Sequence, residues 1–144
     1  MRTQCPEIKL YAQEPAFTPI DTSFLGLLGF EALGAGIEMH IGMHTFVYAP
    51  FVDWHLLLPL FLQGKDPPLY VGNEILDDYT VYAQVEEKKK KVDECNQLGH
   101  AFLQHRDMVK LGAFSLHAHA LNGMVAYVKK EQEADGGDSK TATR

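Results

Sequence analysis

The longest apolar stretch of the chain covers residues 24–62 and reads FLGLLGFEALGAGIEMHIGMHTFVYAPFVDWHLLLPLFL. Between Phe24 and Phe51 the only charged side chains are Glu31 and Glu38. A transmembrane helix needs roughly 20 consecutive, predominantly apolar residues. The pattern therefore predicts a first membrane-spanning or interfacial region over residues 24–62.

The residues before this stretch predict where its helix begins. Asp21, Thr22 and Ser23 belong to the residue types that cap helix N-termini, so a helix is expected to start near Phe24. Glycines within the stretch would weaken a helix in water by about 1 kcal/mol each relative to alanine. In a membrane, small residues instead allow helices or flat ligands to approach closely.

A second segment without charged residues reads LGAFSLHAHALNGMVAYV and is flanked by Lys110 on one side and by Lys129 and Lys130 on the other. Its length is close to the minimum for a membrane span. Lysines at both ends can extend their charged groups to the membrane interfaces. The pattern predicts a second span over residues 111–130.

The remaining segments complete the expected organisation of a single domain, residues 1–144. Residues 1–23 are rich in proline and predict an extended arm. Residues 63–110 form a polar loop, which includes a segment of helix-forming composition over residues 81–105. The polar tail, residues 131–144, is expected to be mobile. The predicted fold is mainly α: a small membrane protein with two transmembrane helices, an extended N-terminal arm and a polar helical loop.

Charge and cysteine content narrow the function classes. The chain has 13 basic and 19 acidic residues and a net charge of -6, whereas a nucleic-acid surface is expected to be basic. Nucleic acid is therefore not an expected partner. Cys5 and Cys95 lie far apart and form no C-x-x-C pair, so both are predicted to be free thiols.

Ionisable residues within the apolar segments are the candidate binding residues. A charged group near the centre of a membrane helix costs at least about 2.5–3.5 kcal/mol and normally has a partner or a ligand. On a helix, residues four apart share a face and residues two apart do not, so a pair of the first kind could hold one metal or pigment. The alternative is that the histidines are hydrogen-bonded to neighbours in a core. The candidate cofactor-binding residues are Glu38, His40, His44, His55, His117 and His119.

Short pieces of the first third of the chain follow a known pattern. They are Lys9, Tyr11, Glu14 and Pro15; then Thr18, Pro19, Ile20, Asp21 and Ser23; then Gly36, Ile37, Glu38, Phe46, Pro50 and Phe51. Over residues 9–51 the chain resembles the PsaL family of photosystem I membrane subunits. The resemblance implies a non-catalytic protein of the thylakoid membrane, in a chloroplast or a cyanobacterium, that binds chlorophyll and carotenoid. Its partners would be other photosystem I subunits, pigments and membrane lipid, with chlorophyll magnesium held by His44 or His117.

Two alternatives stay open at this point. One is a soluble, helical, His-rich metal-binding protein or enzyme. The spacing does not favour it, since there is no Glu-x-x-His pair, HExxH, GxGxxG, P-loop or G-x-S-x-G sequence. The other is a soluble α-helical or α+β binding module in which residues 24–62 form a buried core.

Overall fold

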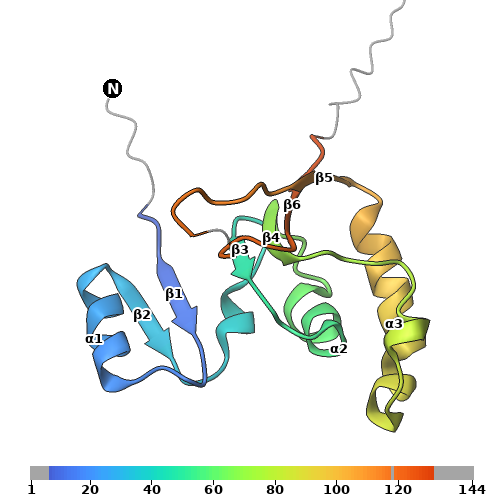
Figure 1. Ribbon diagram of the computed structural model, residues 1–144, viewed down its shortest axis with the longest axis horizontal. Coiled ribbons are helices and arrows are strands. Elements are labelled where there is room, and N and C mark those ends of the chain that lie inside the picture. The colour runs from blue at the N-terminus through green and yellow to red at the C-terminus, as the bar shows by residue number, and fades with distance from the viewer. Residues whose placement is uncertain (1–6, 118, 132–144) are drawn as a thin grey trace, which may run out of the picture. The chain divides into compact units, whose positions relative to one another are not determined.

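The computed structural model describes residues 7–117 and 119–131. The chain divides into two compact units, Met1–His40 and Ile41–Arg144, and contains a two-stranded and a four-stranded sheet (Figure 1). Within the described residues no helix is long and apolar enough to cross a membrane. The predicted mainly α membrane protein with two transmembrane helices is therefore wrong, and the fold is mixed α/β. Cys5 and all of the predicted tail except Glu131 lie outside the described residues.

The first unit contains one β-α-β motif. Its elements are β1 (Leu10–Gln13), α1 (Pro19–Leu27), β2 (Phe30–Leu33) and the 3-10 helix η1 (Ile37–His40). Strands β1 and β2 are parallel, with Leu10 paired to Phe30. Helix α1 begins at Pro19, earlier than the expected start near Phe24, because Thr18 is its N-cap residue. The Thr18 hydroxyl accepts the N–H of Asp21 at 3.2 Å, and the Asp21 carboxylate accepts the N–H of Thr18 at 2.8 Å.

Glycines divide the long apolar stretch into several elements. Gly29 has φ 90° and Gly36 has φ 87°, a backbone conformation that glycine adopts without steric cost. The chain turns at the first of these between α1 and β2, and at the second before η1. Residues 24–62 therefore form two strands and several short helical segments instead of a span.

The second unit is built on a four-stranded sheet in the order β3-β4-β6-β5. Strands β3 and β4 are parallel, and the other two pairings are antiparallel. The segment predicted as the second span, residues 111–130, is a loop followed by strand β6, so that prediction is wrong. The helix predicted within residues 81–105 is α3. The elements are β3 (Phe46–Ala49), α2 (Trp54–Leu56), the π-helix η2 (Leu57–Leu62), β4 (Leu69–Asn73), the 3-10 helix η3 (Thr80–Tyr82), α3 (Glu86–Leu103), β5 (Arg106–Lys110) and β6 (Met124–Lys129).

One face of this sheet forms the core together with η2 and α3. Val47 pairs with Tyr70 and Tyr70 with Tyr127, so these three side chains share one face. Phe102 of α3 packs edge-on against both tyrosines, with ring centroids 5.8 Å and 5.5 Å away. Burying aromatic rings of this size accounts for much of the stability of a small core. The leucines that η2 adds to this core are Leu57, Leu58 and Leu62.

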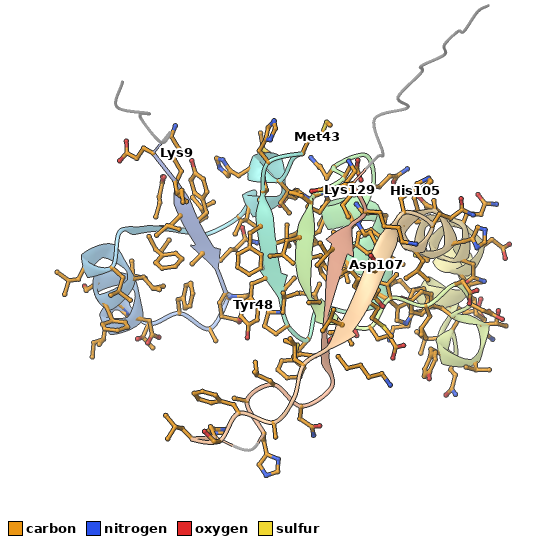
Figure 2. The ribbon with its side chains drawn as sticks, turned by 90° about the horizontal axis from the view of Figure 1, so that it is seen from above. Lys9, Met43, Tyr48, His105, Asp107 and Lys129 are labelled. Atoms are coloured by element: carbon orange, nitrogen blue, oxygen red, sulfur yellow. The ribbon has the colours of Figure 1, made fainter. Side chains whose placement is uncertain are left out.

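The opposite face of the sheet is also apolar, but its side chains are exposed. Phe46 and Tyr48 of β3, Val109 of β5 and Val128 of β6 are between 44% and 59% exposed. Figure 2 shows the sheet from above, with Tyr48 at one edge strand and Asp107 at the other. Strands β3, β4 and β6 are thus largely apolar on both faces and show no alternation of apolar and polar residues.

Candidate functional site at the carboxyl ends of β3 and β4

The parallel strands β3 and β4 end side by side, with Ala49 paired to Gly72. In sheets with parallel strands, ligands bind outside the carboxyl ends of the strands. Here this edge is formed by the turn Pro50–Asp53 after β3, and by Asn73 and Glu74 at the end of β4. It is the candidate functional site.

Asn73 links the two strand ends through both groups of its side chain. Its Oδ1 accepts the backbone N–H of Phe51 at 3.1 Å, and its Nδ2 donates to the carbonyl of Val52 at 3.2 Å. Its own carbonyl accepts the hydroxyl of the buried Tyr70 at 3.1 Å. The amide of Asn73 therefore holds the turn after β3 in one conformation.

Phe51 has an unusual conformation within this turn. Its φ is 60°, in the left-handed region that bulky residues rarely adopt. Its side chain is 73% exposed, so no burial of the ring offsets the backbone strain, which typically costs about 1–3 kcal/mol. Strain of this kind is concentrated at binding and catalytic sites.

Carboxylates give the edge an acidic character. Asp53 precedes α2 and makes no capping hydrogen bond, and Glu74 directly follows β4 with its side chain exposed. Asp53 forms a long ion pair with the partly exposed Lys88, with Nζ 4.0 Å from Oδ2. The carboxylates can therefore accept hydrogen bonds from hydroxyl or amino groups of a ligand.

Trp54, the single tryptophan of the chain, is held rigidly beside this edge. Its ring stacks on that of Tyr79, with centroids 4.7 Å apart and planes at 17°. The hydroxyl of Tyr79 accepts the N–H of Leu76 at 2.8 Å, and burial raises the pKa of Tyr79 to about 12. Trp54 can thus report on events at the strand ends by its fluorescence.

The six residues predicted as ligands have different environments. His55, in α2, is 7% exposed, and its Nδ1 has no hydrogen-bond partner among the described residues. His40 is exposed and stacks on Tyr11, with ring centroids 3.9 Å apart, and Glu38 is partly buried. Whether any of the six binds a cofactor, chlorophyll and carotenoid included, stays a prediction. The remaining three, all exposed, are His44, His117 and His119.

No metal centre is formed in the part of the chain that the structure describes, since no three His, Cys, Asp or Glu side chains lie together as metal ligands would. The alternative of a helical, His-rich metal-binding protein is therefore not supported. Sequence reasoning also missed Phe51 and Asn73 as functional candidates. The available signal was the position of Gly72–Asn73 directly after an apolar run, which is how a parallel strand ends.

Two parallel β-α-β motifs and a four-stranded sheet of mixed direction define a small α/β protein. The chain belongs to the SRR1 domain family, whose sequence model matches residues 1–128. No curated protein and no solved structure gives a significant match.

The family and the fold together correct the functional expectations. The resemblance to the PsaL family was misleading, because the SRR1 domain match covers residues 1–128 and includes all of the residues that suggested it. The predictions of a chlorophyll-binding photosystem I subunit, of photosystem, pigment and lipid partners, and of a thylakoid membrane location are therefore wrong. The short motifs of residues 9–51 lie on strands, short helices and turns instead of a membrane helix.

Proposed function

We propose that the protein binds a small planar molecule of the nucleoside class at the carboxyl ends of β3 and β4. The observation that carries this proposal is the conformation of Phe51. Its ring is exposed, and its backbone, with φ 60°, donates a hydrogen bond to the side chain of Asn73. An exposed ring on a strained backbone contributes little to stability. Its position suits it to stack on the flat face of a ligand, as aromatic residues do on nucleic-acid bases.

The charges at the edge support a nucleoside over a nucleotide. Asp53 and Glu74 can accept hydrogen bonds from ribose hydroxyls, a role that acidic residues have in dinucleotide-binding folds. A phosphate would be repelled by the same two carboxylates. The turn reads Pro-Phe-Val-Asp and lacks the glycines that let a backbone approach phosphate.

His55 is the one predicted ligand residue that the proposal includes. It follows Asp53 and Trp54 in the sequence, and its buried Nδ1 has no hydrogen-bond partner among the described residues. Buried polar atoms are nearly always hydrogen-bonded, so a ligand or a water is expected to satisfy this one.

The test is a fluorescence titration of Trp54 with adenosine, guanosine and cytidine, each compared with its 5′-monophosphate. We expect saturable quenching, with nucleosides bound more tightly than monophosphates. Phe51→Ala should weaken binding by about tenfold or more, because base–aromatic stacking contributes about 1–3 kcal/mol.

The matched control is Phe46→Ala, which removes an exposed ring from the opposite end of the same strand. This variant should bind like the unmodified protein. Absence of saturation at millimolar nucleoside, or equal effects of the two phenylalanine substitutions, would contradict the proposal.

A further inference from the structure

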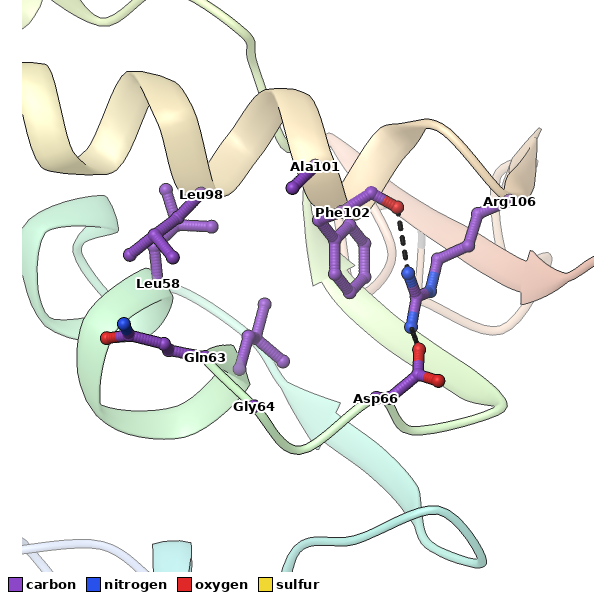
Figure 3. Close-up of a pocket in the computed structure, with 9 residues that line it drawn as sticks. Leu58, Gln63, Gly64, Asp66, Leu98, Ala101, Phe102 and Arg106 are labelled. Atoms are coloured by element: carbon purple, nitrogen blue, oxygen red, sulfur yellow. Dashed lines mark hydrogen bonds and ion pairs between the residues drawn. The ribbon is translucent and has the colours of Figure 1, made fainter.

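A pocket of the larger unit lies between η2 and α3, and the residues that line it do not belong to the candidate site (Figure 3). Its volume is about 170 Å³. A cavity of about 150 Å³ lined by apolar side chains is large enough for benzene. The pocket therefore has room for one ring or one branched aliphatic group. Its apolar lining is Leu58, Leu62, Leu98, Ala101 and Phe102, and its polar lining includes Gln63, Asp66 and Arg106.

The wall formed by η2 is a π-helix, Leu57–Leu62. π-Helical turns are rare and are frequently found at functional sites. Pro59 lies inside η2 and has no N–H to donate, which helps to explain why regular α-helical bonding is not maintained there. The pocket thus coincides with an irregular helix whose leucines Leu58 and Leu62 both face it.

The polar end of the pocket belongs to a cluster of three charged side chains with an excess of one positive charge: Arg106 and Asp66 line the pocket, and Lys129 lies outside its lining. The side chain of Arg106 is only 4% exposed, and its Nη2 donates to Asp66 at 2.6 Å. The other carboxylate oxygen of Asp66 is bound by Lys129, so two cations share one carboxylate. Nη1 of Arg106 donates to the carbonyl of Phe102 at 2.8 Å, whereas the buried Nε has no partner among the described residues.

The backbone at Asp66 is unusual as well, because its φ is 50°. Asp tolerates the left-handed region better than most residues, but the conformation still has to be maintained by its surroundings. Asp66 therefore positions the guanidinium of Arg106 at the rim of an apolar pocket. Because Asp66 also pairs with Lys129, the three side chains together carry one positive charge.

We infer that this pocket binds a small monocarboxylate with an apolar body, of the size of an aromatic or branched short-chain acid. The apolar body lies among Leu58, Leu62 and Leu98, and the carboxylate faces the cationic end at Arg106. This inference does not depend on the proposed nucleoside site, since it uses other residues and other ligands.

The test uses three ligands with the same ring and different charge: benzoate, benzamide and benzylamine. The full chain is titrated with each, and the NMR signal of the Arg106 Nε–H is followed. Arg106 is the only arginine among the described residues, and its buried N–H is expected to exchange slowly. We expect benzoate to bind most tightly, benzamide more weakly and benzylamine most weakly.

Two substitutions on the same helix distinguish pocket binding from surface association. Ala101→Leu fills the pocket, whereas Gln97→Leu adds a leucine at an exposed position one turn earlier that does not line it. Benzoate binding should fall at least tenfold in the first variant and stay unchanged in the second. The inference is overturned if benzoate does not saturate the signal, if benzylamine binds as tightly as benzoate, or if Ala101→Leu binds like the unmodified protein.

Discussion

The Oδ1 atom of Asn73 lies 3.1 Å from the backbone nitrogen of Phe51 and accepts its hydrogen bond. The two residues are 22 positions apart in the sequence: Asn73 is the last residue of β4, and Phe51 lies in the turn that follows β3. Through this bond, the residue that ends β4 sets the backbone of the turn that follows β3. The candidate site therefore depends on one side chain from a neighbouring strand.

Replacement of Asn73 by alanine should destabilise the protein and abolish nucleoside binding. The change removes the bonds to Phe51 and Val52, and each lost hydrogen bond is expected to cost about 0.5–1.5 kcal/mol. Urea unfolding measures the stability, and the Trp54 titration measures binding. Asn122→Ala, at an exposed position, is the control and should change neither. Unchanged nucleoside binding in Asn73→Ala would show that the hydrogen bond between Asn73 and Phe51 is not needed for the proposed site.

Replacement of Asp66 by asparagine tests the partly buried ion pairs that Asp66 makes with Arg106 and Lys129. Asparagine tolerates the left-handed backbone, so the change isolates the loss of charge beside Arg106. We expect a loss of about 1–3 kcal/mol, towards the lower limit because the Asp66 side chain is 45% exposed and water compensates in part. Thermal unfolding at neutral pH measures the change, and Asp107→Asn, at a more exposed ion pair, should cost less.

The same carboxylate gives the protein a pH dependence at acid pH. The hydrogen bond from Lys129 lowers the pKa of Asp66, burial opposes this shift, and Arg106 adds to it. Because the folded pKa is below the unfolded value near 3.8, the stabilisation is present above about pH 4 and is lost as pH falls below it. Between pH 5 and pH 2 the free energy of unfolding should fall less in Asp66→Asn than in the unmodified protein. The same fall in unfolding free energy in Asp66→Asn and in the unmodified protein would contradict this assignment.

Replacement of Gly99 by alanine should destabilise the protein although Gly99 lies inside helix α3. Helix propensity alone predicts a gain of about 1 kcal/mol. However, a Cβ at this position would overlap with the backbone carbonyl of Leu76, and such overpacking typically costs about 1–3 kcal/mol. Gly112→Ala meets no atom within 4 Å and is the control. A melting temperature of Gly99→Ala at or above that of the unmodified protein would show that the packing of α3 against Leu76 is looser than described.

Tyr127→Phe should reveal a buried hydrogen-bonded pair in the core. The Tyr127 hydroxyl accepts the N–H of Ile75 at 2.9 Å and donates to the carbonyl of the same residue at 3.3 Å. Its removal leaves two buried backbone groups without a partner, and we expect a cost of about 1–3 kcal/mol. Denaturant unfolding measures this, with Tyr82→Phe, at a position 56% exposed, as the control. Equal stability of the two variants would contradict the assignment.

Burial of the core tyrosines also predicts the alkaline limit of stability. Burial raises the pKa of Tyr70, Tyr79 and Tyr127. Because the folded values exceed the unfolded value near 10, this stabilisation is complete below pH 10 and is lost as pH rises above it. In Tyr127→Phe the fall in unfolding free energy above pH 10 should be smaller than in the unmodified protein.

The helix within residues 81–105 could be predicted from the sequence, because helix formation depends on neighbours within four residues. The Thr18–Asp21 capping pair is equally local, although the sequence pattern misplaced the helix start by treating Asp21 as a cap residue. The strands could not be recognised in this way. β3, β4 and β6 are apolar on both faces, so they lack alternation and resemble segments of a buried or membrane helix.

The sequence by itself determined the acidic balance, the polar helix α3 and the candidate His55, because each is a property of residue type or local spacing. Only the tertiary structure decided that parts of residues 24–62 and 111–130 form paired strands, since pairing joins segments far apart in the chain. The same is true of the site. Phe51 and Asn73 have no relationship in the sequence, and they meet because the parallel register of β3 and β4 brings the two strand ends together.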